Sequence, residues 1–196
     1  MKKILNKLIS YIEFKLLNIY IKNSGIITRG NVIFKHKPEI DIHKEANIIL
    51  GNNVVINSKK KGYHLNMFNT CKLIANKGGA LIKIGDNTRI HGTCIHAFKQ
   101  IIIGNNCLIA ANCQIFDCNA HDISFPDVNN RINTSGTSKE IEIGDNVWLA
   151  TGVIVLPGVK IGNGSIITAN SVVHMDIPPM VIAGGNPIKI IKNYMQ

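Results

Sequence analysis

A six-residue repeat between Ile143 and Val173 constrains the fold of this chain more than any other feature. A period of six fits neither an α-helix, which repeats about every 3.6 residues, nor a strand that alternates between two faces. Four residues after most of the aliphatic positions stands a smaller or β-branched residue, namely Val147, Val153, Val159, Ser165 or Ser171. The aliphatic positions themselves are Ile143, Leu149, Val155, Ile161, Ile167 and Val173.

This period is expected when three short strands form one triangular coil and successive coils stack into a solenoid. The aliphatic residue then points into the prism, and Gly, Asn and Asp occupy the turns because they tolerate unusual backbone angles. The same spacing continues backwards to Ile84 and Ile115, and it places His121 where the next aliphatic residue is expected. We therefore predict an all-β solenoid of hexapeptide repeats.

The net charge indicates which classes of partner the chain can bind, and the cysteines indicate the redox compartment. The chain has 22 Lys and Arg against 12 Asp and Glu, a formal charge of +10, which favours polyanionic partners. Nucleic acid is not expected, because the basic residues are dispersed and only 6% of residues are aromatic. The five cysteines lack CxxC pairs, which argues against a disulfide framework or a zinc cluster. Cys94, Cys107 and Cys113 fall in small inward slots, so we expect core thiols in a reducing compartment.

The chain divides into an N-terminal segment, residues 1–24, and a solenoid, residues 25–196. Within residues 2–22, apolar residues recur every three or four positions, as on one face of an amphipathic helix: Ile4, Leu8, Ile12, Leu16 and Ile19. This helix is too charged to span a bilayer, and no signal-peptide cleavage site follows it. It either caps the end of the solenoid or lies on an anionic membrane surface, and the sequence leaves both open.

Two segments of the solenoid break the repeat. Residues 122–139 are polar and rich in Asn, Ser and Pro, so we expect a loop ejected from the coil, beside a binding site. Residues 178–196 begin with two prolines, where the stack must end, and form a C-terminal tail.

Ordered motifs connect the repeat to a known family. They are Asp145-Asn146-Val147-Trp148-Leu149-Ala150, Leu156-Pro157-Gly158-Val159, Asp176-Ile177-Pro178-Pro179 and Gly185-Asn186-Pro187-Ile188-Lys189. With these motifs, about residues 84–193 resemble the hexapeptide-repeat acyltransferases, most closely the galactoside, maltose and polysaccharide O-acetyltransferase branch. The resemblance implies a left-handed parallel β-helix, a homotrimer, and acetyl-CoA bound in active sites between neighbouring subunits. No metal is expected.

His121 is the candidate catalytic residue, because the resemblance implies a histidine general base just before the ejected loop. Acyl transfer from a thioester to a hydroxyl needs a base that titrates near neutral pH, and imidazole has this property. Direct transfer in a ternary complex needs no covalent enzyme intermediate. Asp117 and Asp122 are both candidates for orienting the ring, and this choice stays open.

The resemblance also implies the contacts to the cosubstrate and the acceptor. Small residues would let the pantetheine arm lie flat, the backbone N–H of Thr151 would stabilise the oxyanion, and basic residues would meet the phosphates. His174 stands where family members commonly carry Thr or Lys. The expected acetyl-CoA contacts are Trp148, Ala150, Thr151, Ala169, His174, Lys189 and Lys192. His91 stands where galactoside-type members have an acceptor-binding Asn, and His96 continues the six-residue register from Ile90. Both are candidate acceptor contacts, with ordinary surface or groove histidines as the alternative.

We predict an acetyl-CoA-dependent O-acetyltransferase that acts on a carbohydrate hydroxyl in surface polysaccharide biosynthesis: capsule, O-antigen or lipooligosaccharide. It is expected in the cytoplasm, with peripheral contact to the inner membrane through residues 2–22 as an option. An N-acetyltransferase acting on an amino sugar remains an alternative. A second alternative is a zinc protein like the γ-carbonic anhydrases, because His91 and His96 are five residues apart. A third alternative is a solenoid without catalytic activity.

Overall fold

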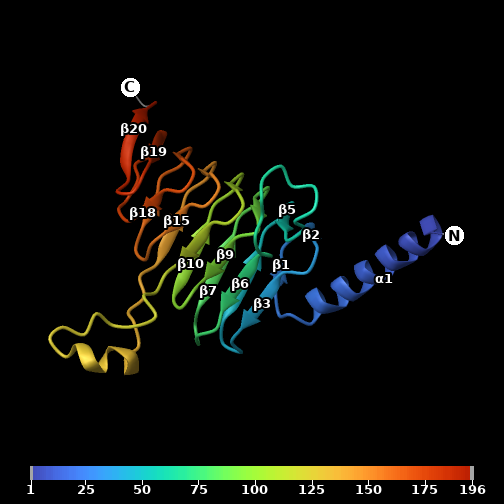
Figure 1. The fold of residues 1–196 in the computed structure, drawn as a ribbon, viewed down its shortest axis with the longest axis horizontal. Coiled ribbons are helices and arrows are strands. Elements are labelled where there is room, and N and C mark those ends of the chain that lie inside the picture. The colour runs from blue at the N-terminus through green and yellow to red at the C-terminus, as the bar shows by residue number, and fades with distance from the viewer. Residues whose placement is uncertain (1, 195–196) are drawn as a thin grey trace.

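The computed structural model describes residues 2–194, which form a three-sided prism of short strands with one long helix at its N-terminal end (Figure 1). After helix α1 (Lys2–Lys22) the chain turns after every strand. Each strand from β1 to β15 therefore pairs in parallel with the strand three positions further on. This arrangement matches the stacked coils that the six-residue period predicts.

The prism has three sheets, called A, B and C here in the order in which each coil visits them. Sheet A holds β1 (Ile27–Thr28), β4 (Asn47–Leu50), β7 (Leu81–Ile84), β10 (Gln100–Ile103), β13 (Ile141–Ile143) and β16 (Lys160–Ile161). Sheet B holds β2 (Val32–Lys35), β5 (Val54–Asn57), β8 (Arg89–His91), β11 (Leu108–Ile109), β14 (Trp148–Leu149), β17 (Ile166–Ile167), β19 (Val181–Gly184) and β20 (Lys189–Asn193). Sheet C holds β3 (Glu39–Ile42), β6 (Lys72–Ala75), β9 (Cys94–His96), β12 (Gln114–Phe116), β15 (Ile154–Val155) and β18 (Val172–Val173).

The core consists of aliphatic side chains stacked in register along the prism axis. Ile82, Ile101 and Ile141 are direct partners in neighbouring strands of sheet A, and all three are fully buried. Burying one such side chain stabilises the fold by about 1.5–3 kcal/mol. Because every coil repeats the contact with its neighbours, the stability of the solenoid is a sum over coils and their interfaces.

Asparagines at the turns from sheet A to sheet B adopt left-handed backbone angles, as the sequence predicts. Asn53, Asn87, Asn106 and Asn146 have φ values of 55 to 58°. Asn is one of the few residues other than Gly that adopts this conformation readily. The side chains also bond from coil to coil: Asn87 Nδ2 donates to Asn106 Oδ1 at 3.2 Å.

The predicted register is wrong at one turn. The next buried aliphatic residue after the inward-facing Ile90 is Ile95, five positions later instead of six. The spacing is shorter because the turn at Gly92 (φ +45°) has one residue fewer than a regular turn. Thr93 therefore fills the small inward slot, and Cys94 is only half-buried. His96 consequently lies one position beyond the inward residue.

The other two cysteines occupy the predicted slots. Cys107 and Cys113 are fully buried in the core cluster. Burial raises the pKa of the Cys113 thiol to about 11, so this group stays protonated and unreactive at neutral pH.

The ejected loop begins earlier than predicted, and His121 belongs to it. An antiparallel bridge between Cys118 and Ser138 closes the neck of the loop, which contains the 3₁₀-helix Val128–Asn133 and stands away from the prism (Figure 1). His121 is exposed, so the prediction that it occupies an aliphatic position is wrong. Ile141 takes that position, because the chain leaves the coil before another repeat is complete.

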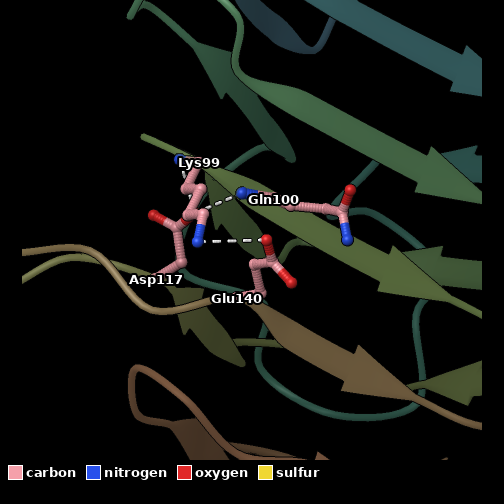
Figure 2. A network of polar contacts seen from close by, with 4 residues as sticks. All are labelled: Lys99, Gln100, Asp117 and Glu140. Carbon is pink, nitrogen blue, oxygen red and sulfur yellow. Dashed lines mark hydrogen bonds and ion pairs between the residues drawn. The ribbon is translucent and has the colours of Figure 1, made fainter.

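Asp117 fixes the point at which the loop leaves the prism. Its side chain is fully buried and accepts hydrogen bonds from the backbone N–H groups of Phe98, Lys99 and Gln100 at 2.7, 2.7 and 2.8 Å. Figure 2 shows the contacts of Asp117 with Lys99 and Gln100 beside the exposed ion pair between Lys99 and Glu140, whose charged atoms are 3.1 Å apart. A buried carboxylate with three donors holds the turn before β10 and the neck of the loop together.

Helix α1 contacts the prism only near its C-terminal end. Leu17, Tyr20 and Ile21 are half-buried, and the Tyr20 hydroxyl accepts a hydrogen bond from the Ile40 N–H at 3.2 Å. The rest of the helix points away from the prism (Figure 1), so only its C-terminal part packs on the end of the solenoid. In residues 2–194, no helix is both long and apolar enough to cross a membrane.

We predict that Asp117→Ala lowers the free energy of unfolding by about 2–4 kcal/mol, because three backbone N–H groups lose the buried carboxylate that accepts from them. Urea denaturation measures this change. The matched control is Glu140→Gln, which breaks only the exposed ion pair with Lys99 and is expected to cost less than about 1 kcal/mol. Equal effects of the two substitutions would show that Asp117 does not hold the neck.

Candidate functional site

A groove of about 500 Å³ runs along sheet B at the turns that lead to sheet C. Its floor comes from successive coils, and its outer wall comes from the insertion between β5 and β6, which also leaves the prism at this edge. Four of the predicted site residues for the cosubstrate and one for the acceptor lie together here. The lining residues are Tyr63, His64, Leu65, His91, Leu108, Ile109, Ala110, Trp148, Ala150, Thr151 and Ala169.

The strand register explains how the groove is formed. Ile90, Ile109 and Leu149 are partners in neighbouring strands of sheet B, so the residues that follow them stack in successive coils. These residues are His91, Ala110 and Ala150. Two alanines beyond the imidazole leave a channel along the edge of the prism, and a large side chain at either position would fill it.

His91 is held in one tautomer. Its Nδ1 lies 3.1 Å from Asn57 Nδ2, and because an amide nitrogen only donates, Nδ1 must accept. The proton of the neutral ring is therefore on Nε2. Burial lowers the pKa of His91, and the positive charges of Lys35 and Arg89 lower it further. At neutral pH His91 is thus an uncharged hydrogen-bond donor through Nε2.

The outer wall of the groove was not predicted from the sequence. The Tyr63 ring lies 4.6 Å from the His64 ring and 4.9 Å from the His91 ring. Burial raises the pKa of Tyr63, so its phenol stays protonated. The available signal was the interruption of the repeat between Asn57 and Cys71, which indicates a second insertion in addition to the ejected loop.

Thr151 offers a backbone donor at the floor of the groove. The N–H groups on either side of it, from Ala150 and Gly152, donate to Ile167 and Ala111 at 2.9 Å each. Within residues 2–194 the Thr151 N–H has no such acceptor, while its hydroxyl donates to the Ala111 carbonyl at 2.7 Å. This N–H is free to bind an oxygen that gains negative charge.

Two predicted phosphate contacts lie beyond the groove on the same sheet. Lys189 and Lys192 belong to β20, which pairs with β19 and continues sheet B to its C-terminal end. Both side chains are exposed, and Lys192 Nζ lies 4.6 Å from the centre of the Tyr194 ring. They give this end of sheet B a positive charge.

Three predicted site residues lie on a different edge of the prism. His96 ends β9, His174 follows β18, and His121 lies in the loop after β12, so all three are at turns from sheet C to sheet A. His96 Nε2 is 3.1 Å from Asn76 Oδ1. None of the three lines the groove of its own chain. The pair required by the zinc-protein alternative, His91 and His96, is separated onto two sides of the prism.

Both aspartates considered for orienting His121 have other hydrogen-bond partners. The Asp117 carboxylate binds three backbone N–H groups, and Asp122 Oδ1 accepts from the Ser124 N–H at 3.3 Å. His121 itself donates its backbone N–H to the Asn119 carbonyl. The ring of His121 is therefore exposed on the loop.

A second depression, of about 590 Å³, lies on sheet A near the C-terminal end. Its lining includes Glu142, Lys160 and Asp176 but none of the predicted site residues. The Glu142 carboxylate pairs with Lys160 Nζ at 3.5 Å, and Asp176 Oδ1 accepts from the Lys160 N–H at 2.8 Å. These three residues pair with one another, and none of the predicted site residues lies here. We therefore assign the functional site to the groove on sheet B.

Comparison with known proteins bears on the family of the chain. The family model described as "Bacterial transferase hexapeptide (six repeats)" matches residues 140–174. Galactoside O-acetyltransferase of Lactococcus lactis subsp. lactis is 43% identical over 91 residues, 46% of this chain and 42% of that protein. The chain spans about half the length of the curated relatives that it matches.

Solved structures of acetyltransferases are also similar to this chain. A hexapeptide-repeat acetyltransferase from Vibrio cholerae, in complex with acetyl coenzyme A, has a TM-score of 0.55 and 30% identity over 64% of this chain and 69% of that chain. The polySia-specific acetyltransferase NeuO has a TM-score of 0.52 and 27% identity over 85% of this chain and 69% of that one. With the repeat, the family model and the Vibrio structure in agreement, the chain belongs to the hexapeptide-repeat acyltransferase family.

Proposed function

We propose that the protein transfers the acetyl group of acetyl-CoA to a hydroxyl of a carbohydrate, as a step in surface polysaccharide biosynthesis. The observation that carries this proposal is the groove on sheet B, where Trp148, Ala150, Thr151 and Ala169 lie together with His91 at the turns of successive coils. Relatives named for galactoside and polySia acetylation support a carbohydrate acceptor. They also favour a hydroxyl over an amine as the accepting group.

The groove fits the thin pantetheine arm of acetyl-CoA. Ala110, Ala150 and Ala169 keep it open, and the half-exposed Trp148 ring gives it an apolar wall. Lys189 and Lys192 lie further along the same sheet, where they can meet the phosphates of the nucleotide. The Vibrio relative was solved with acetyl coenzyme A, which supports this cosubstrate.

We further propose a homotrimer of left-handed coils, in which the groove of one chain faces the loop edge of its neighbour. On one chain, His121 and His174 lie at turns from sheet C to sheet A, whereas the groove lies at turns from sheet B to sheet C. A groove and a base on separate edges can form one site only across an interface, and cyclic symmetry repeats that contact at each interface.

The residues then have complementary roles. Acetyl-CoA supplies the activated acetyl thioester. His121 of the neighbouring chain takes the proton of the acceptor hydroxyl as its oxygen forms the ester bond, and returns a proton to the departing sulfur. The free N–H of Thr151 donates to the carbonyl oxygen while it carries negative charge, and the Nε2–H of His91 donates to the acceptor.

We place this reaction in the cytoplasm. Acetyl-CoA is an intracellular cosubstrate, and the five free cysteines fit a reducing compartment. The charge of +10 suits a cosubstrate that carries several phosphates.

An acceptor screen tests the proposed function. Purified protein is incubated with acetyl-CoA and with sugars, amino sugars, nucleotide sugars or oligosaccharide repeats, and thiol release and product mass are measured. We expect an ester on a sugar hydroxyl. Exclusive formation of an amide would identify an N-acetyltransferase instead, and no transfer to any acceptor class would favour the non-catalytic solenoid.

We predict that His121→Ala lowers kcat by about 10²–10⁴-fold, the usual contribution of a general base, without changing folding or association. Steady-state kinetics and sedimentation measure the two properties. His36→Asn is the matched control, because His36 is exposed, does not line the groove and has a left-handed φ of 70° that Asn tolerates. Near wild-type activity of His121→Ala would remove His121 from its proposed role.

We predict that His91→Asn, which keeps an N–H donor, retains the acceptor KM within a few-fold, whereas His91→Leu raises it about tenfold, the cost of one hydrogen bond.

NMR titration should show a His91 pKa below the ordinary value. Because burial lowers this pKa, the unfolded chain takes up the proton first, so His91 costs stability as pH falls below about 6.5. A raised pKa, or equal KM values for the two variants, would contradict the donor assignment.

A further inference from the structure

Helix α1 carries an apolar face that the prism does not use. Six large aliphatic side chains on this face are 45 to 61% exposed. With about 100° of rotation per residue, they fall within an arc of about 100° along the helix. We call this set the outward face; it consists of Leu5, Leu8, Ile9, Ile12, Leu16 and Ile19.

The helix is attached to the prism through other residues. Leu17, Tyr20 and Ile21 are half-buried. Leu17 and Ile21 project away from the centre of the outward face, and Tyr20 lies beside its edge. The Tyr20 hydroxyl accepts from the Ile40 N–H at 3.2 Å, and Lys37 Nζ lies 4.2 Å from the centre of the Tyr20 ring. Packing on the solenoid therefore does not explain the outward face.

The charge of the helix indicates what this face binds. Residues 2–22 contain five lysines and one glutamate, so the segment has a net charge of 5 − 1 = +4. Lys15 and Lys22 are exposed beside the outward face; the side chains of Ile4 and Lys7 lie outside the part that the structure describes. An apolar face flanked by lysines suits a helix that lies flat in the headgroup layer of an anionic membrane.

Other copies of the chain are the alternative occupant. Leu5, Ile9, Ile12, Leu16 and Ile19 alternate by four and three, as the seam of a coiled coil does. Two observations favour lipid. Parallel helices would bring together segments of charge +4, which repel one another. A seam would also leave Leu8, a residue of the outward face that is 54% exposed, in water.

We propose that the outward face of α1 binds the surface of a membrane that contains anionic lipid, with the helix lying in the plane of the headgroups. Apolar burial and lysine attraction act together, and neither involves the groove on sheet B. The proposal is therefore independent of the reaction assigned to that groove.

Flotation of the full-length protein with vesicles tests this proposal. Vesicles of phosphatidylcholine with about one third phosphatidylglycerol are compared with phosphatidylcholine alone, at low and high salt. We expect binding to the mixed vesicles that weakens as salt is raised. Ile12→Glu should reduce the partition coefficient by more than tenfold, because it removes an apolar side chain from the lipid and adds a charge.

Asn18→Glu is the matched control, because Asn18 is exposed on the other side of the helix and the substitution changes the net charge equally. We expect less than about a threefold effect for it. No binding to the mixed vesicles, or equal losses for Ile12→Glu and Asn18→Glu, would overturn the proposal. Dissociation of an oligomer by Ile12→Glu without lipid would instead assign the outward face to other copies of the chain.

Discussion

The in-register stacking of inward aliphatic residues is the interaction on which the rest of this structure depends. Because Ile90, Ile109 and Leu149 are partners in neighbouring strands, the residues after them form a straight column on the outer edge of the prism. That column holds an imidazole followed by two alanines, and it forms the floor of the groove, whose outer wall comes from the insertion between β5 and β6. A shift of one coil by a single residue would turn the inward residues outward and destroy the core and the groove together.

The period of six predicts the stacked coils, the turn asparagines and the buried Cys107 and Cys113, because core packing requires the same residue type in every coil. It fails where the chain departs from the repeat. The short turn at Gly92 shifts Thr93 inward, and the loop neck at Asp117 releases His121 to the surface. Tyr63 was missed for the same reason, since the conformation of an insertion depends on contacts that no periodic pattern encodes.

Similarly, only some of the predicted site residues lie together in one chain. Cosubstrate contacts near Trp148 and Thr151 follow from motifs that stand in regular coils, and the structure gathers them in one groove. His121 and His174 lie on another edge, so their assignment depends on how copies of the chain assemble. Asp117 matters here because its buried carboxylate holds the neck of the loop that carries His121. Helix α1 adds a separate apolar surface that the prism does not cover.

Complementation between two inactive variants tests the central claim, that each site joins the groove of one chain to His121 of another. His121→Ala lacks the base, and Ala150→Trp fills the groove; each homo-oligomer is expected to be inactive. When the two are co-expressed, a chain with an intact groove meets a neighbour with an intact base at about one site in four, so we predict about a quarter of wild-type activity. Activity no greater than the sum of the separate variants would contradict the shared site, because it would mean that the groove and the base must belong to the same chain.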